Sequence, residues 1–101
     1  MKADIGITLS KIEEIREELI AKLCSVKNEI KNYGEVKSDS KSVAINYANS
    51  KQEEANNHYQ EMKGYIEKHK GTDKLVKQLI RHMASIDGYA KKIENLCGNG
   101  N

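Results

Sequence analysis

The chain has 101 residues, of which 38% are hydrophobic and 32% are charged, and its formal net charge is +2. It contains no Pro, Trp or Phe, so aliphatic residues and Tyr must build any core, and the strongest helix breaker is missing. This length and composition exclude a large single-core fold and favour a small all-α protein, whose core is a narrow strip between helices.

The positive excess lies in the last third of the chain. From residue 72 onward, the three acidic residues are Asp73, Asp87 and Glu94. The five basic residues of this part are Lys74, Lys77, Arg81, Lys91 and Lys92. This bias is far weaker than the dense basic stripe of a nucleic-acid-binding domain, and it favours the C-terminal end of a last helix.

The first predicted element is a helix over residues 10–33. Ser10 and Glu13 match a capping box, in which each side chain accepts a hydrogen bond from the other residue's backbone N–H. Gly34 is a typical residue just after a helix end. Apolar residues recur in steps of three and four on one face: Ile12, Ile15, Leu19, Leu23, Val26, Ile30 and Tyr33. At 1.5 Å per residue this helix would be about 36 Å long.

The second predicted element covers residues 40–70, after a polar and serine-rich linker. Its apolar face consists of Ala44, Ile45, Ala48, Ala55, Tyr59, Met62 and Ile66. The stretch NSKQEEANNH between Ala48 and Tyr59 offers only Ala55 to a core and contains several Asn residues, which are mediocre helix formers. We therefore expect this middle segment to be the most loosely packed.

The last predicted element covers residues 73–97. Its apolar positions alternate in steps of three and four, which is the a/d pattern of a helix that packs on another helix. These positions are Val76, Leu79, Met83, Ile86, Ala90, Ile93 and Cys97. The tail GNGN, residues 98–101, is predicted to be disordered, which leaves residues 1–97 as a single helical domain.

Two interpretations of the junction at residues 70–73 remain open. Gly71, Thr72 and Asp73 combine a helix stop with the N-cap of a new helix, which predicts a break. The heptad phase nevertheless continues across Gly71, as it would in one uninterrupted helix. We favour an antiparallel bundle of three elements (10–33, 40–70 and 73–97), with a hairpin of helix 10–33 against one long arm 40–97 as the alternative.

No motif in the sequence carries identifiable chemistry. Cys24 and Cys97 are far apart and form no CxxC or Cys/His motif, so neither a zinc site nor a disulfide framework is indicated. His58 and His69 could share a helix face, but exposed polar residues explain them better than a metal site does. We expect no catalytic residue, no metal and no cofactor.

The candidate functional residues are apolar side chains that could contact another chain. Ile20 and Cys24 lie beside the stripe of the first helix, and Leu75 and Ile80 lie beside the stripe of the last. With Met83 and Cys97, they give six predicted partner-binding residues: Ile20, Cys24, Leu75, Ile80, Met83 and Cys97. Small helical units often complete their core by packing against a partner chain or another copy.

The overall plan resembles the small helical-hairpin proteins of the WXG100/ESAT-6 class and related partner proteins of toxins exported by the type VII pathway. The residues concerned are the apolar lead ADIGITLSKIEEI, the break at Tyr33-Gly34, and Tyr89 followed by Ile93 and Glu94. The Trp-x-Gly turn and the strict Tyr-x-x-x-Asp/Glu motif of that class are absent. The resemblance implies a non-enzymatic role in pairing with a similar protein or a larger cargo.

The leading functional hypothesis is a small interaction protein that packs apolar helix faces against a partner chain, with a type VII partner or chaperone of a larger toxin as its specific form. The alternatives are a regulatory bundle that binds nucleic acid through its C-terminal basic residues, and a self-assembling structural coiled coil. No membrane-spanning run and no signal-peptide core are evident, so we expect synthesis in the cytoplasm, and any export would need no cleaved leader.

Overall fold

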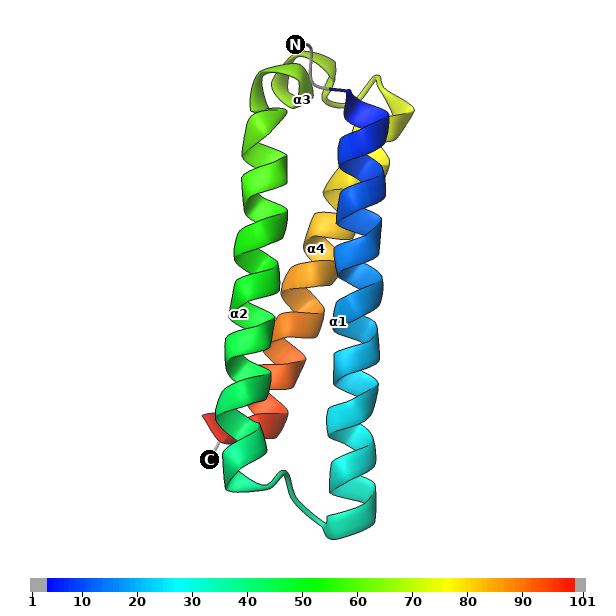
Figure 1. The fold of residues 1–101 in the computed structure, drawn as a ribbon. Helices are drawn as coiled ribbons and strands as arrows, with labels where there is room; N and C mark the ends of the chain where they lie inside the picture. Colours follow the sequence, from blue (N-terminus) through cyan, green and yellow to red (C-terminus); the bar gives the residue numbers. More distant parts are fainter. Residues whose placement is uncertain (1–3, 100–101) are drawn as a thin grey trace.

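The computed structural model describes residues 4–99, and every regular element in that range is helical. The long helices form a rod of 47 × 22 × 21 Å (Figure 1). The radius of gyration is 15.5 Å, compared with about 13 Å for a globular chain of similar length. The all-α prediction is therefore confirmed, and the molecule is elongated.

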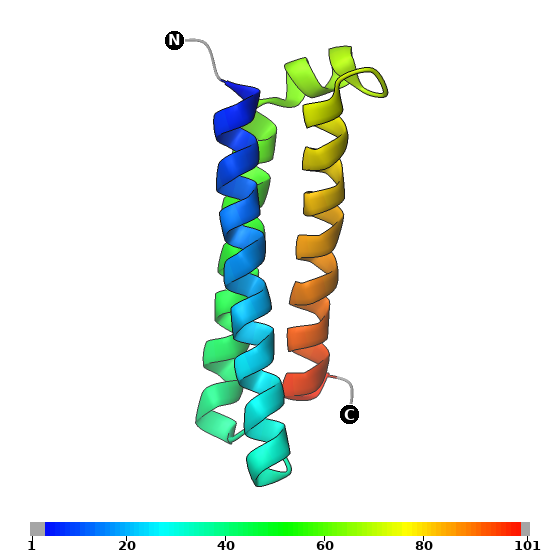
Figure 2. The same cartoon turned by 90° about the vertical axis from the view of Figure 1, so that its right-hand side faces the viewer.

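Four α-helices and one π-helical turn follow one another along the chain. They are α1 (Ile5–Tyr33), α2 (Ser38–Glu61), α3 (Lys63–His69), α4 (Lys74–Glu94) and the turn η1 (Asn95–Asn99). Helices α1 and α4 run in the same direction, and α2 runs opposite to both (Figure 1). The short helix α3 lies across one end of the rod (Figure 2). The three-element bundle is therefore the arrangement that the chain adopts.

Helix α1 begins five residues before its predicted start. Asp4 is the N-cap, and its side chain accepts a hydrogen bond of 2.8 Å from the backbone N–H of Gly6. The capping box predicted at Ser10 is wrong, because Ser10 lies inside the helix and is exposed. Ile5 and Leu9 extend the buried stripe by two more turns, so burying them favours the longer helix. The predicted end of the stripe is also wrong, since Tyr33 is 64% exposed.

The first reversal of the chain is a short, well-bonded loop. Gly34 adopts a left-handed φ of 82°, and its N–H donates to the carbonyl of Ile30 at 2.7 Å, as in other glycine-terminated helices. Val36 is buried at this end of the rod. The N–H of Lys37 donates to the carboxylate of Glu29 at 2.8 Å. Helix α2 then begins at Ser38, close to the predicted start.

The second predicted helix is divided at Met62. Its φ of −106° and ψ of 7° leave the helical region, and α3 starts directly after it. Met62 and Ile66 are both buried, so the bend allows α3 to cover the end of the core. Sequence analysis missed this break because position 62 is occupied by Met, which is not a helix breaker as Pro or Gly would be.

The break predicted at residues 70–73 is confirmed, and the single long arm 40–97 is wrong. Gly71 has a φ of 89°, which ordinary residues rarely adopt, and the N–H groups of Thr72 and Asp73 both donate to the carbonyl of His69. Asp73 caps α4 by accepting a 2.9 Å hydrogen bond from the N–H of Leu75. Local stop and start residues thus determine the reversal, and the shared heptad phase does not.

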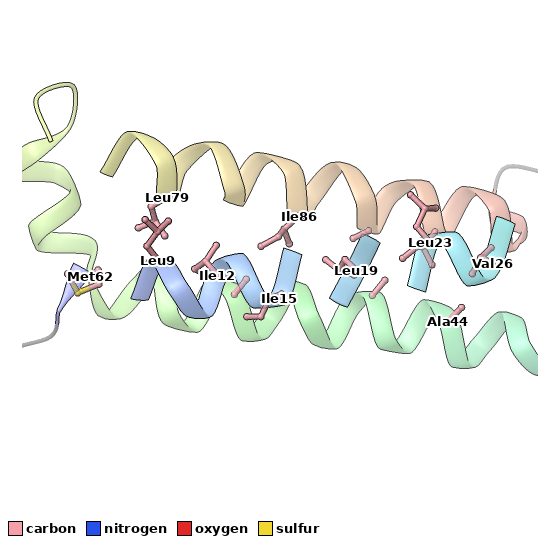
Figure 3. Close-up of a cluster of buried hydrophobic side chains, with 14 of the residues drawn as sticks. Leu9, Ile12, Ile15, Leu19, Leu23, Val26, Ala44, Met62, Leu79 and Ile86 are labelled. Atoms are coloured by element: carbon pink, nitrogen blue, oxygen red, sulfur yellow. The ribbon is translucent and has the colours of Figure 1, made fainter. Parts of the chain in front are cut away.

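The core is built mainly by α1 and α4, whose large side chains point toward each other along the rod (Figure 3). The largest fully buried side chains are Ile12, Leu19, Val76, Leu79, Ile86 and Ile93. The residues that α2 buries are all alanines, namely Ala44, Ala48 and Ala55. The expectation of a thinly packed middle segment fits this asymmetry, because alanine side chains bury little apolar area.

The C-terminal end of the bundle is closed by η1, in which Cys97 is buried. Gly98 has a φ of 108° and ends the regular backbone. The predicted disordered tail begins at this residue, and its last two residues lie outside the described range. Among residues 4–99, no helix is both long enough and apolar enough to cross a bilayer.

Candidate functional site

The accessible members of the predicted partner-binding set lie mainly on the surface where α1 and α4 meet. We call this surface the α1–α4 seam, and it consists of Glu13, Arg16, Ile20 and Cys24 on α1 and Leu75, His82 and Tyr89 on α4. Glu13 and His82 approach across it, with 3.9 Å between the Glu13 Oε2 and His82 Nε2 atoms. Further along, the guanidinium of Arg16 lies 5.7 Å from the ring centre of Tyr89. Both contacts join α1 to the parallel helix α4 at the surface of the rod.

The seam includes apolar residues that the core leaves uncovered. Ile20 follows Arg16 by one turn and is half-buried, and Cys24 follows Ile20 by one turn and is exposed. On the other side, Leu75 lies seven residues before His82 on α4, and Leu96 lies in η1, just beyond the end of α4. Leu75 is 37% exposed and Leu96 is 38% exposed. Thus Ile20, Cys24 and Leu75, three of the six predicted residues, share one surface.

The other three predicted residues are used inside the bundle. Ile80 and Met83 are partly buried and pack against the core. Cys97 is 3% exposed, and burial raises the pKa of its thiol. None of the three belongs to the α1–α4 seam, so they stabilise this chain and offer little surface to another one.

A polar network joins α1 to α2. The ammonium of Lys51 lies 2.7 Å from the carboxylate of Glu18 and 3.3 Å from that of Glu54. Tyr47 donates from its hydroxyl to Glu18 at 3.4 Å, and its ring lies near the ammonium groups of Lys22 and Lys51. The hydrogen bond to Glu18 is the largest cause that raises the pKa of Lys51, while burial is the largest that raises the pKa of Tyr47.

This network occupies the level of the rod where an apolar α2 residue would otherwise be expected. Lys51 and Gln52 stand between the buried Ala48 and Ala55, and both are half-buried. Gln52 donates from its amide to the carboxylate of Asp87 on α4 at 3.1 Å. Helix α2 is therefore positioned by polar contacts to both neighbours as well as by alanine packing, which favours one register over others.

A second polar cluster lies where α3 meets α4. Tyr65 donates from its hydroxyl to Asp73 at 2.6 Å, and its ring packs against His69 with 4.3 Å between the ring centres. The hydrogen bond from Tyr65 is the largest cause that lowers the pKa of Asp73. The same hydrogen bond raises the pKa of Tyr65. Because Asp73 also caps α4, the cluster holds the reversal in place.

Groups that could support small-molecule chemistry are sparse in the described residues. No set of three or more His, Cys, Asp or Glu side chains in the range 4–99 is placed to hold a metal ion. A shallow hollow on the outward side of α2 is open to solvent. It is lined by Ser50, Glu53, Glu54 and Asn57. Exposed polar side chains of this kind bring no nucleophile together with a base.

Sequence analysis did not identify Arg16 and Tyr89, or Leu96 just beyond α4, as residues of this surface. Leu96 was detectable as an apolar residue beside the stripe position Cys97. Arg16 and Tyr89 were not, because their contact depends on the relative register of two helices that are distant in sequence. Comparisons of the chain with protein-family models, curated proteins and solved structures gave no match.

Proposed function

We propose that this chain is a non-enzymatic helical interaction protein, which packs its α1–α4 seam against another chain. The observation that carries this proposal is the set of uncovered apolar residues on the seam, Ile20, Cys24 and Leu75, with Leu96 just beyond the end of α4. Apolar side chains that gather on one surface after the core has closed are typical of interaction sites. The polar clusters around Lys51 and Asp73 lie elsewhere and act within the bundle.

In its specific form, the proposal makes the chain a type VII secretion-associated partner, which targets or protects a larger toxin. Its support is the resemblance to the WXG100 class, together with the small size and all-helical fold. That class is built on helical hairpins, and this chain adds a third long helix, α4. A toxin or secretion-ATPase gene beside this one would favour the specific form, and a neighbourhood without either would disfavour it.

The proposal is tested by placing a charge on the seam. Leu75→Glu and Leu96→Glu each put a carboxylate where a partner would bury an apolar side chain, and we expect loss of the partner chain from the purified complex. Val43→Glu is the matched control, because Val43 is 59% exposed on α2, away from the seam. Circular dichroism checks that each variant stays folded. Equal retention of the partner by all three variants would contradict the proposal.

A second candidate is supported by the outward face of α4. The five basic residues of this helix are all exposed: Lys74, Lys77, Arg81, Lys91 and Lys92. None of them has an ion-pair partner among residues 4–99. Such a face could bind nucleic acid, with an affinity that falls steeply as salt rises. Titration of duplex DNA at low ionic strength separates the candidates, since the interaction proposal expects no binding there.

A further inference from the structure

One row of α1 residues beside the seam has a self-complementary order of charges. The row consists of Glu13, Glu17, Ile20, Cys24, Lys27 and Lys31, in alternating steps of four and three. This spacing places all six on one side of the helix. Ile20 is half-buried, and the other five are exposed. We call these six residues the α1 row.

The α1 row is symmetric about the level of Lys22. Two acidic residues precede the central pair Ile20 and Cys24, and two basic residues follow it at mirrored distances. The carboxylates remain accessible, because the side chains of Glu13 and Glu17 are 52% and 70% exposed. Their own contacts, to His82 at 3.9 Å and to Arg16 at 3.3 Å, lie at the surface and leave them able to bind a second group.

We propose that the α1 row binds the α1 row of a second copy of this chain, with the two helices antiparallel. A twofold axis at the level of Lys22 brings each residue opposite its complement. Glu13 then faces Lys31 of the partner subunit, Glu17 faces Lys27 of the partner subunit, and Ile20 faces Cys24 of the partner subunit. This inference rests on the proposed function and names a partner for the α1 side of the seam, where Ile20 and Cys24 lie.

The charges discriminate between this arrangement and its alternatives. A parallel pair would place Glu against Glu and Lys against Lys, which is repulsive. The outward face of α4 carries Lys74, Lys77 and Arg81 without an acidic counterpart, so it cannot pair with itself. The outward face of α2 carries Asn and Ser residues with the carboxylates of Glu53 and Glu54, and the lysines of α2, Lys41 and Lys51, are half-buried. Of these three faces of the described helices, the α1 row is the one that has both signs in a mirrored order.

The resulting dimer should be weak and sensitive to salt. The row extends over 18 residue steps, or about 27 Å, and its centre contributes only two apolar side chains per subunit. Exposed ion pairs each add little and are screened by salt. We therefore expect dissociation constants of roughly micromolar to millimolar order, as for small interfaces.

The direct test is an exchange of charges between two forms of the intact chain. The variant E13K/E17K has a row that is basic at both ends, and the variant K27E/K31E has a row that is acidic at both ends. Each variant alone should be monomeric, because every facing pair is then repulsive, whereas an equimolar mixture should form a heterodimer about as tight as the wild-type dimer, because both contain four attractive pairs and no repulsive one. Sedimentation equilibrium at low ionic strength measures both.

A cysteine experiment tests the antiparallel register independently. In the proposed dimer, the two Cys24 residues are offset by about 6 Å along the helix axis in addition to the lateral spacing, which exceeds the reach of an unstrained disulfide. Ile20→Cys places a thiol opposite the partner subunit's Cys24, so mild oxidation should give a covalent dimer. The control Ser25→Cys puts a thiol on the same helix, outside the row, and should give none.

The two experiments have defined outcomes. A heterodimer from the mixture, with crosslinking by Ile20→Cys alone, supports the inference. A monomeric mixture, efficient crosslinking of the wild-type Cys24, or equal crosslinking by Ser25→Cys overturns it. If the inference fails while Leu75→Glu and Leu96→Glu still release a different protein, the proposed function stands with another partner.

Discussion

Asp73 is the residue on which the second reversal depends. Its carboxylate accepts hydrogen bonds from the N–H of Leu75 and from the hydroxyl of Tyr65. Both donors favour the ionised form, which lowers the pKa of Asp73 in the folded chain. The stability that Asp73 contributes is therefore present at neutral pH and is lost as the pH falls through its folded-state pKa.

We expect Asp73→Asn to reveal this contribution. The amide can still cap α4 but cannot be ionised, so the variant should unfold at a lower temperature than the wild type at pH 7. The difference should shrink in acid, where Asp73 of the wild type becomes protonated as well. Thermal unfolding followed by circular dichroism at both pH values measures this effect, with Asp39→Asn as the control. A difference that does not change with pH would refute this explanation.

Leu19 represents the large apolar residues on which the core depends. It is 0% exposed, so Leu19→Ala should remove methyl groups and leave a cavity, lowering the free energy of unfolding by about 2–5 kcal/mol. Ile7 provides a matched control on the same helix, because it is 59% exposed. Ile7→Ala should change stability by less than about 0.5 kcal/mol. Urea unfolding of both variants measures the difference. Equal decreases in the free energy of unfolding would mean that Leu19 is not buried in the core.

The helices contribute unequally to the rod. Helices α1 and α4 supply the Ile, Leu and Val residues of the core, whereas α2 supplies alanines and the polar contacts of Lys51 and Gln52. Alanines allow two helices to approach closely, which makes the α2 positions sensitive to added volume. The packing of α2 therefore depends more on how closely it can approach α1 and α4 than on how much apolar area it buries.

We expect Ala48→Leu to be destabilising although it adds apolar surface. Ala48 is fully buried, so the larger side chain must push α2 away from its neighbours, at a cost of about 1–3 kcal/mol. Ala84→Leu is the control, because Ala84 is exposed on α4 and has room for the larger side chain. Chemical denaturation of the two variants gives the comparison. A stabilised Ala48→Leu protein would show that α2 does not approach closely.

The elements were predicted from sequence to different degrees. The apolar stripe of α1 was predicted, but the start of the helix was not, because Ser10 and Glu13 match the pattern of a capping box. The true start was indicated in the sequence by Asp4, an N-cap residue, followed by the apolar residues Ile5 and Leu9. The stop at Gly71 was predicted because backbone conformation and capping are local. The bend at Met62 was not predicted, because it depends on how α3 covers the end of the core with Ile66. This packing is a property of the tertiary structure.

The candidate surface shows the same limit at the level of the whole molecule. Sequence spacing identified Ile20, Cys24 and Leu75 as residues beside the helix stripes. Sequence spacing could not distinguish these three accessible residues from Ile80 and Met83, which pack against the core. The distinction depends on which side of α4 faces α1. The assembled rod supplies this information, and it places the first three on the α1–α4 seam.

At the scale of the whole molecule, the three long helices form a rod, and the association that we propose takes place along its α1 side. Nineteen hydrophobic residues are buried between the helices of the single chain. The α1 row combines two accessible apolar residues, Ile20 and Cys24, with acidic residues at one end and basic residues at the other. An interface on this side would leave the outward faces of α2 and α4 in contact with water, and a pairing of two such rods would be reversible.

Sedimentation equilibrium of the intact wild-type chain, from micromolar to millimolar concentration, tests this central claim most directly. At low ionic strength we expect reversible association that weakens when salt is added and when Lys27 and Lys31 are both replaced by Glu, but not when Val43 is. A single monomeric species throughout, with no protein co-purifying from the native cell, would contradict the claim that the α1 side of the rod is built for association.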